Sequence, residues 1–179
     1  MKEFFIKHNK AIFVAVSTIF FMVVGYIIMF TNLGAIAPQK GIEVMDGKWF
    51  YPPSYIKETL SNLGAEGRAQ YTVFHIIDYF FLVSYCMVMM SITRLVTSAK
   101  WVWVVFPLLP SSLDLIENTL IEIAISSYPN ISANLSKAIS VFTTLKWSTG
   151  ILWFAVFIAL LSLNIIRLIK KFKQQKQNQ

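Results

Sequence analysis

The chain has 179 residues, of which 56% are hydrophobic and only 14% are charged, and its formal net charge is +7. Soluble domains carry about 25% charged residues, so this composition excludes an ordinary soluble domain and indicates a membrane protein. The basic residues flank apolar stretches, which argues against nucleic acid as a partner, and the single cysteine, Cys86, excludes an internal disulfide framework.

Four apolar stretches predict an all-α integral membrane protein: one domain, residues 1–179, folded as a bundle of four transmembrane helices. The expected spans are about 11–31, 69–93, 101–127 and 138–166. Each is long enough to cross about 30 Å of hydrocarbon at about 1.5 Å per residue. The first stretch is too long for the apolar region of a secretory signal peptide, so we expect it to be retained as a helix.

A long polar segment, residues 32–70, separates the first two spans and is the predicted first outer loop. It contains a short partly amphipathic helix, Tyr55–Leu63, which Ser54 can cap and Gly64 can end. Two interpretations stay open for this helix. It anchors the loop at the membrane surface, which we favour, or it covers the polar stripe of the second span as a lid.

The third span contains two prolines, Pro107 and Pro110, which remove two backbone donors and predict a kink or a break. After it comes a short external turn with the glycosylation acceptor pattern at Asn130 and at Asn134. That pattern has meaning only in a eukaryotic source.

The distribution of Lys and Arg predicts that both termini are cytoplasmic. With the ends inside, ten basic residues lie on the cytoplasmic side and five on the outer side, and Lys146 lies within the fourth span. This is the expected positive-inside pattern. Residues 170–179 then form a basic cytoplasmic tail that meets anionic lipid headgroups. The expected location is a bacterial plasma membrane.

The second span carries a polar stripe on one face. Arg68, Tyr71, His75, Asp78 and Tyr85 follow one another at steps of three, four, three and seven residues. A charged side chain facing lipid at mid-depth costs about 2.5–3.5 kcal/mol or more. The stripe is therefore expected to face protein or trapped water.

Matching polar residues occur on the next two spans. Asp114, Glu117 and Asn118 share one face of the third span, and Lys146 lies within the fourth. Counted from the outer ends, these residues and Asp78 fall within one slab about 6 Å thick. We therefore predict a polar, outward-facing cavity, which His75 also lines, with Arg68 near its mouth. Further along the same strips lie Ser111, Glu122 and Thr143.

The charges in this slab do not balance. Lys146 lies too deep to reach the membrane surface easily, so we expect an ion pair with Asp114 or Glu117. Three acids lie in the slab, Asp78, Asp114 and Glu117, against the single Lys146, so two negative charges are left without a partner. Protons, a cation or metal ion, or a cationic ligand must neutralise the remainder. A network that only fixes the register of the helices is the alternative, but small residues serve that purpose at lower cost.

The predicted function is binding of a small cationic or amphiphilic ligand or lipid, with transport left open. The candidate ligand-binding or proton-handling residues are Asp78, Asp114, Glu117, Asn118, His75, Lys146, Arg68 and Tyr71. The alternatives are a membrane-embedded enzyme doing acid–base chemistry on a lipid-soluble substrate, and a structural subunit of a larger complex. Besides the lipid bilayer, a second copy or a larger membrane complex is a candidate partner.

No metal or other cofactor is predicted. The sequence has no Glu-x-x-His or His-x-x-x-His pair, which zinc and di-iron centres use. It contains only two histidines, one of them the terminal His8, which excludes a bis-histidine haem within the bundle. No motif of a known family is matched residue by residue.

Overall fold

The structure is a computed structural model that describes residues 12, 14–27, 41 and 43–177. Within these residues the chain is helical and has no β-strand. A single 3₁₀ turn, η1 (Met45–Gly47), precedes three long helices, α2 (Ser54–Val96), α3 (Lys100–Ser127) and α4 (Ala133–Gln177). A shorter apolar helix covers Val14–Ile27. The predicted all-α class is confirmed.

Three of these helices, α2, α3 and α4, are long and apolar enough to cross a membrane. They contain the predicted spans 69–93, 101–127 and 138–166 and extend beyond them. The Val14–Ile27 helix falls inside the predicted span 11–31, whose two ends lie outside the described residues.

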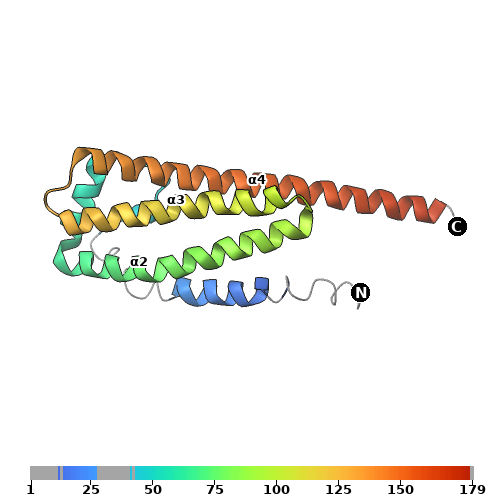
Figure 1. The fold of residues 1–179 in the computed structure, drawn as a ribbon, viewed down its shortest axis with the longest axis horizontal. Coiled ribbons are helices and arrows are strands. Elements are labelled where there is room, and N and C mark those ends of the chain that lie inside the picture. Colours follow the sequence, from blue (N-terminus) through green and yellow to red (C-terminus); the bar gives the residue numbers. More distant parts are fainter. Residues whose placement is uncertain (1–11, 13, 28–40, 42, 178–179) are drawn as a thin grey trace.

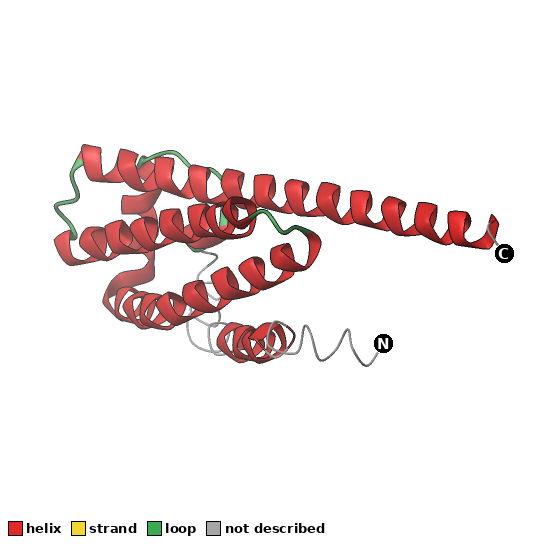
Figure 2. Ribbon diagram, turned by 45° about the vertical axis from the view of Figure 1, so that its right-hand side comes forward, coloured by secondary structure: helices red, strands yellow, loops and turns green. Residues whose placement is uncertain are grey.

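The three long helices form an up–down–up bundle in which α3 packs against both α2 and α4 (Figures 1 and 2). One end of the bundle, here called the loop end, holds residues 43–63 and the α3–α4 turn, 128–132. The opposite end, here called the basic end, holds the α2–α3 turn, 97–99, and the last part of α4. The Val14–Ile27 helix lies along α2, where Phe81 would contact a Cβ added to Gly25 at 3.4 Å.

Gly64 bends α2 sharply. Its φ of 71° and ψ of −175° form a backbone conformation that is open essentially to glycine alone. The helical conformation is thus interrupted at Gly64, as predicted, but only at this residue. The second part of α2 begins directly after it and therefore before residue 69, where the second span was predicted to start. Arg68 stabilises the bend, because its Nη1 donates to the carbonyl of Leu60 at 2.8 Å.

The main apolar core lies at the loop end. Ile56, Leu60 and Leu63 of the short first part of α2 are fully buried, together with Ile121 of α3 and Ile139 of α4. Burying each such side chain contributes about 1.5–3 kcal/mol. Protein therefore covers the apolar face of the short helix, which was expected to lie on the membrane surface as an anchor.

The two prolines do not break α3. Lys100–Ser127 is one helix that contains Pro107 and Pro110. Of the predicted kink or break, the break is therefore wrong, and the kink stays a prediction. Proline has the φ of a helix, and each one removes only a single hydrogen bond, so a helix packed on both sides tolerates it.

Candidate functional site

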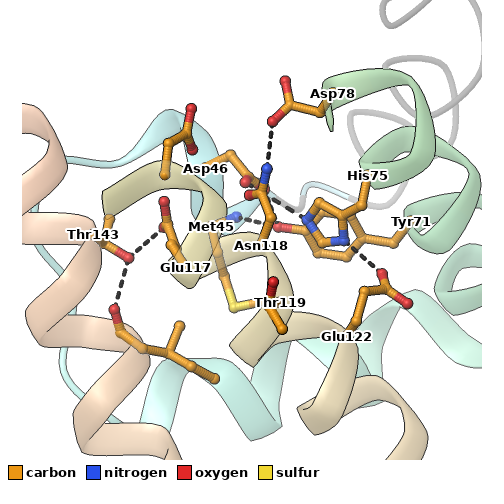
Figure 3. A network of polar contacts seen from close by, with 12 residues as sticks. Met45, Asp46, Tyr71, His75, Asp78, Glu117, Asn118, Thr119, Glu122 and Thr143 are labelled. Atoms are coloured by element: carbon orange, nitrogen blue, oxygen red, sulfur yellow. Dashed lines mark hydrogen bonds and ion pairs between the residues drawn. The ribbon is translucent and has the colours of Figure 1, made fainter. Parts of the chain in front are cut away.

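Asp78 of α2 and Asn118 of α3 meet at the centre of the site. Asn118 Nδ2 donates to Asp78 Oδ2 at 2.5 Å (Figure 3). Asn118 is fully buried and Asp78 is 7% exposed. Both residues lie on the expected helix faces, which the antiparallel packing of α2 and α3 brings together. Asp78 has a neutral partner here rather than a cation.

Lys146 of α4 is paired with two acids of α3. Its Nζ lies 3.0 Å from Asp114 Oδ1 and also forms an ion pair with Glu117 Oε2. The predicted ion pair is confirmed, and one ammonium serves both acids. Tyr85 extends the arrangement, because its hydroxyl donates to Asp114 Oδ2 at 2.9 Å. Because Glu117 is fully buried, this ammonium is essential for its charge.

His75 lies between two carboxylates. Its Nδ1 is 2.6 Å from Glu122 Oε1, and its Nε2 is 3.6 Å from Asp46 Oδ1 (Figure 3). Nδ1 is within hydrogen-bond distance of Glu122, whereas Nε2 faces Asp46 at ion-pair distance only. Two flanking carboxylates suit a positively charged His75. The ring also stacks on Tyr71 with centroids 4.6 Å apart, and the Tyr71 hydroxyl donates to Asp46.

Residues 45–51 cover the site from the loop end. The backbone nitrogen of Met45 donates to the Tyr71 hydroxyl at 3.1 Å. The Tyr51 hydroxyl and Thr143 Oγ1 are 2.7 Å apart, and Thr143 is in turn 2.5 Å from Glu117. Ser140 Oγ donates to the Tyr51 carbonyl at 2.5 Å. The segment thus contacts α2 at one side of the site and α4 at the other.

The covering segment brings its own charge into the site. Burial by itself would raise the pKa of the Asp46 carboxyl, but hydrogen bonds and charge from His75, with further attraction from Lys146, hold that pKa below its usual range. Asp46 is therefore a carboxylate at neutral pH. Burial also raises the pKa of Tyr51, so its phenol stays neutral and available for hydrogen bonding.

The site has more carboxyl groups than cations. Five of its side chains are acidic: Asp46, Asp78, Asp114, Glu117 and Glu122. Two are basic, Lys146 and His75. Even with His75 charged, three negative charges remain if every acid is ionised. Isolated charges are very costly in a region of low dielectric, so protons or a bound cation are needed.

Four buried polar atoms of the site make no hydrogen bond among the described residues, and Asn118 Oδ1 is the one of them that has no ion-pair partner either. Asn118 Oδ1 accepts no hydrogen bond there, although the residue is fully buried. An unsatisfied buried acceptor costs about 1–3 kcal/mol. The atom belongs to the same amide that donates to Asp78. A ligand with N–H donors could therefore contact the carboxylate and the amide oxygen together.

A metal centre has little support in this arrangement. Within residues 12, 14–27, 41 and 43–177, no three His, Cys, Asp or Glu side chains come together in a way that could hold a metal ion. Lys146 occupies the position between Asp114 and Glu117 where a cation would otherwise bind both.

Seven of the eight predicted site residues lie in this polar network, and Arg68 lies outside it. The seven are Asp78, Asp114, Glu117, Asn118, His75, Lys146 and Tyr71. Arg68 instead packs over the ring of Tyr128, 4.1 Å from its centroid, and bonds Leu60. Its predicted position at the mouth of the cavity has no support among these contacts.

The sequence pattern missed Asp46 and Tyr51 altogether. Both lie in the loop, where no helical periodicity relates them to the stripe. The pair Pro52–Pro53, which stops the preceding aromatic run, was the available signal that this stretch is held in a fixed path. Glu122 and Thr143 had been placed on the correct faces but not in the site.

Comparison with known proteins finds no matching family model, no matching curated protein and no matching solved structure.

Proposed function

We propose that the chain is a four-span membrane protein with both ends in the cytoplasm and the loop end facing outward. The apolar character of α2, α3 and α4, and the position of the Val14–Ile27 helix along α2, support four spans. The ratio of ten inner to five outer basic residues supports the orientation.

Labelling in intact cells tests this orientation. A cysteine replacing Lys48 should react with an impermeant thiol reagent, whereas one replacing Lys173 should react only after the membrane is opened. The reverse pattern would contradict the topology and the outward-facing site together.

We infer that the site binds a small amphiphilic ammonium compound. The observation that carries this proposal is the excess of three carboxyl groups at a site where, among the described residues, Asp78 is bonded to the neutral Asn118 and forms no ion pair. An ammonium group supplies one of the three missing positive charges, the one that faces Asp78, and up to three N–H donors. Asp78 and the unpartnered Asn118 Oδ1 would accept two of them. The apolar helix surfaces around the site suit a ligand with an apolar tail.

In this proposal the remaining residues have separate roles. Lys146 keeps Asp114 and Glu117 ionised and in place. His75 does the same for Asp46 and Glu122, and it links the covering segment to α2 and α3. Asp78 is left as the carboxyl that the ligand neutralises. Transport would require the covering segment to open, since Asp46 and Tyr51 contact both sides of the site.

The second candidate is acid–base chemistry on a lipid-soluble substrate. The observation in its favour is His75, which two carboxylates orient as they do in many general bases. However, the imidazole is fully buried, its Nδ1 is bonded to Glu122 and its Nε2 faces Asp46 of the covering segment. It would reach a substrate only after residues 45–51 had moved away, so ligand binding remains the better-supported proposal. A purely structural subunit is the third alternative.

Ligand binding can be tested with hexylammonium as the probe, and with hexanol and hexanoate as matched compounds of the same chain length. The protein in nanodiscs should gain thermal stability with hexylammonium alone. Asp78→Asn should abolish this gain while the variant stays folded, because the amide keeps the shape but not the charge. Asn118→Leu should weaken it.

Glu66→Gln is the matched control, since Glu66 is an exposed carboxylate on the same helix. It should leave the response to hexylammonium unchanged. Equal stabilisation by hexanol, or an undiminished response in Asp78→Asn, would contradict the proposal. A large loss of stability in Asp78→Asn without any ligand response in the parent protein would instead favour a structural network.

A further inference from the structure

The last part of α4 extends beyond the rest of the bundle. Asn164 Nδ2 donates to the carbonyl of Val96, the last residue of α2, at 2.5 Å, so Asn164 lies level with the α2–α3 turn. Residues 165–177 continue the same helix past that turn (Figures 1 and 2). Thirteen helical residues extend for about 20 Å. We call this segment the projecting helix.

The projecting helix has an apolar stripe that its own chain leaves open. Ile165, Leu168, Ile169 and Phe172 are 48%, 55%, 50% and 69% exposed. Their spacing is i, i+3, i+4 and i+7, which puts all four on one face. This is the pattern by which a helix anchors itself in an apolar groove of a partner protein.

The rest of the projecting helix is basic. It carries five cationic residues and no acid: Arg167, Lys170, Lys171, Lys173 and Lys176. Nearby at the basic end are Arg94, which packs over Trp103, and Lys100. The sequence has no Asp or Glu after Glu122, so nothing later in the chain neutralises this charge. The complementary surface must be acidic.

Position argues for a protein rather than for the lipid surface. The α2–α3 turn is non-helical backbone, which does not lie exposed to lipid within the hydrocarbon, and Asn164 is level with this turn. Phe172 lies eight residues further on, about 12 Å, whereas a headgroup layer is only about 5–8 Å thick. Residues 151–177 contain no Gly or Pro at which the helix could bend back to the membrane.

We propose that the projecting helix docks into the apolar groove of an acidic soluble protein. The stripe Ile165, Leu168, Ile169 and Phe172 would enter the groove, and the lysines would pair with its acidic rim. A second copy of the chain fits less well, because five positive charges on each helix would repel. The docking surface lies at the opposite end of the bundle from the ligand site, so it does not depend on the proposed ligand.

Calcium-loaded calmodulin is a suitable probe because it is acidic and binds basic amphipathic helices in an apolar groove. The full-length protein in phosphatidylcholine nanodiscs should bind it and should release it when calcium is chelated. Leu168→Gln should weaken binding by about tenfold or more, and so should the pair Lys170→Glu and Lys171→Glu. Gln174→Ala, opposite the stripe, is the matched control and should have no effect.

Spin labelling tests the two alternatives to a soluble protein, which are an anionic lipid surface and a second copy of the chain. A nitroxide at Phe172→Cys, in a Cys86→Ser background, should stay accessible to a water-soluble nickel complex in phosphatidylcholine and in phosphatidylserine-rich nanodiscs. Loss of that accessibility with phosphatidylserine would show that the helix lies on anionic lipid and would overturn the proposal. Close nitroxide–nitroxide distances would show pairing of two copies and would overturn it equally, as would failure of calmodulin to bind.

Discussion

The loop end and the basic end of the bundle treat apolar side chains in opposite ways. At the loop end, Leu60 and Leu63 are fully buried in a core to which α2, α3 and α4 all contribute. Towards the basic end, Leu163 and Leu168 are 49% and 55% exposed. In α4, no residue of the most apolar 18-residue window is buried by the protein itself.

This difference shows that the protein itself surrounds the side chains at the loop end, whereas those towards the basic end are exposed to the surroundings. A site with five carboxyls needs fixed partners, because unpaired charges in a low-dielectric region are costly. Lys146 of α4 and His75 of α2 are these partners, and residues 45–51 cover them at the loop end. At the basic end the described residues form no ion-pair network, so α4 can continue there without a covering segment.

The largest expected effect comes from removing the cation of the site. Lys146→Met would leave Asp114 and Glu117 buried without their ammonium and should cost about 3–5 kcal/mol of unfolding free energy. Adding Glu117→Gln should restore part of this loss, because it removes one of the two stranded charges. Unfolding in mixed detergent measures both. Lys137→Met, at an exposed position of α4, should change the free energy by less than about 0.5 kcal/mol.

If the double variant is no more stable than Lys146→Met alone, the two charges do not depend on each other. The loop end would then owe little of its stability to charge pairing.

A pair of identical substitutions compares the two ends directly. Leu60→Ala removes a fully buried side chain from the core and should cost about 2–5 kcal/mol. Leu163→Ala removes the same atoms from a half-exposed position of α4 and should cost well under 1 kcal/mol. Equal losses in thermal or denaturant unfolding would mean that an unseen partner buries the basic end as tightly as the core.

The sequence predicted the two ends unequally well. The stripe of Tyr71, His75 and Asp78 and its facing residues on α3 follow helical periodicity, so their meeting could be foreseen from spacing alone. The positions of Asp46 and Tyr51 could not be foreseen in this way, because the path of a loop depends on tertiary contacts that no local pattern encodes. The depth estimate placed Lys146 beside Asp114 and Glu117 correctly.

Two errors have physical causes of the same kind. The apolar face of the short helix predicts a place at the membrane surface, but in the structure that face packs on Ile121 and Ile139. Of the kink or break expected at Pro107 and Pro110, the break does not occur, because packing on both sides supports α3. Amphipathicity and proline both describe a helix alone, whereas the outcome depends on its neighbours.

Acid should loosen the loop end through Asp46. Its pKa lies below the usual range in the folded protein, so the ionised carboxylate stabilises the fold above the unfolded pKa of about 3.9. This stabilisation is lost progressively as the pH falls below that value. Asp46→Asn should remove about 1.5–3 kcal/mol at neutral pH and less in acid. Unfolding curves of both proteins across the acid range measure the difference, and parallel curves would contradict it.

The smallest expected effect on stability concerns the projecting helix. Leu168→Gln replaces an exposed apolar side chain that contacts no core residue, so the unfolding free energy should change by less than about 0.5 kcal/mol. Leu63→Gln makes the same exchange inside the core and should be severely destabilising, because it buries an unpaired amide. If Leu168→Gln cost more than about 1 kcal/mol, the stripe would already be packed on another part of this chain. An unchanged stability together with weaker calmodulin binding separates the two roles of an apolar residue: at the loop end it holds the fold, and at the basic end it is kept for a partner.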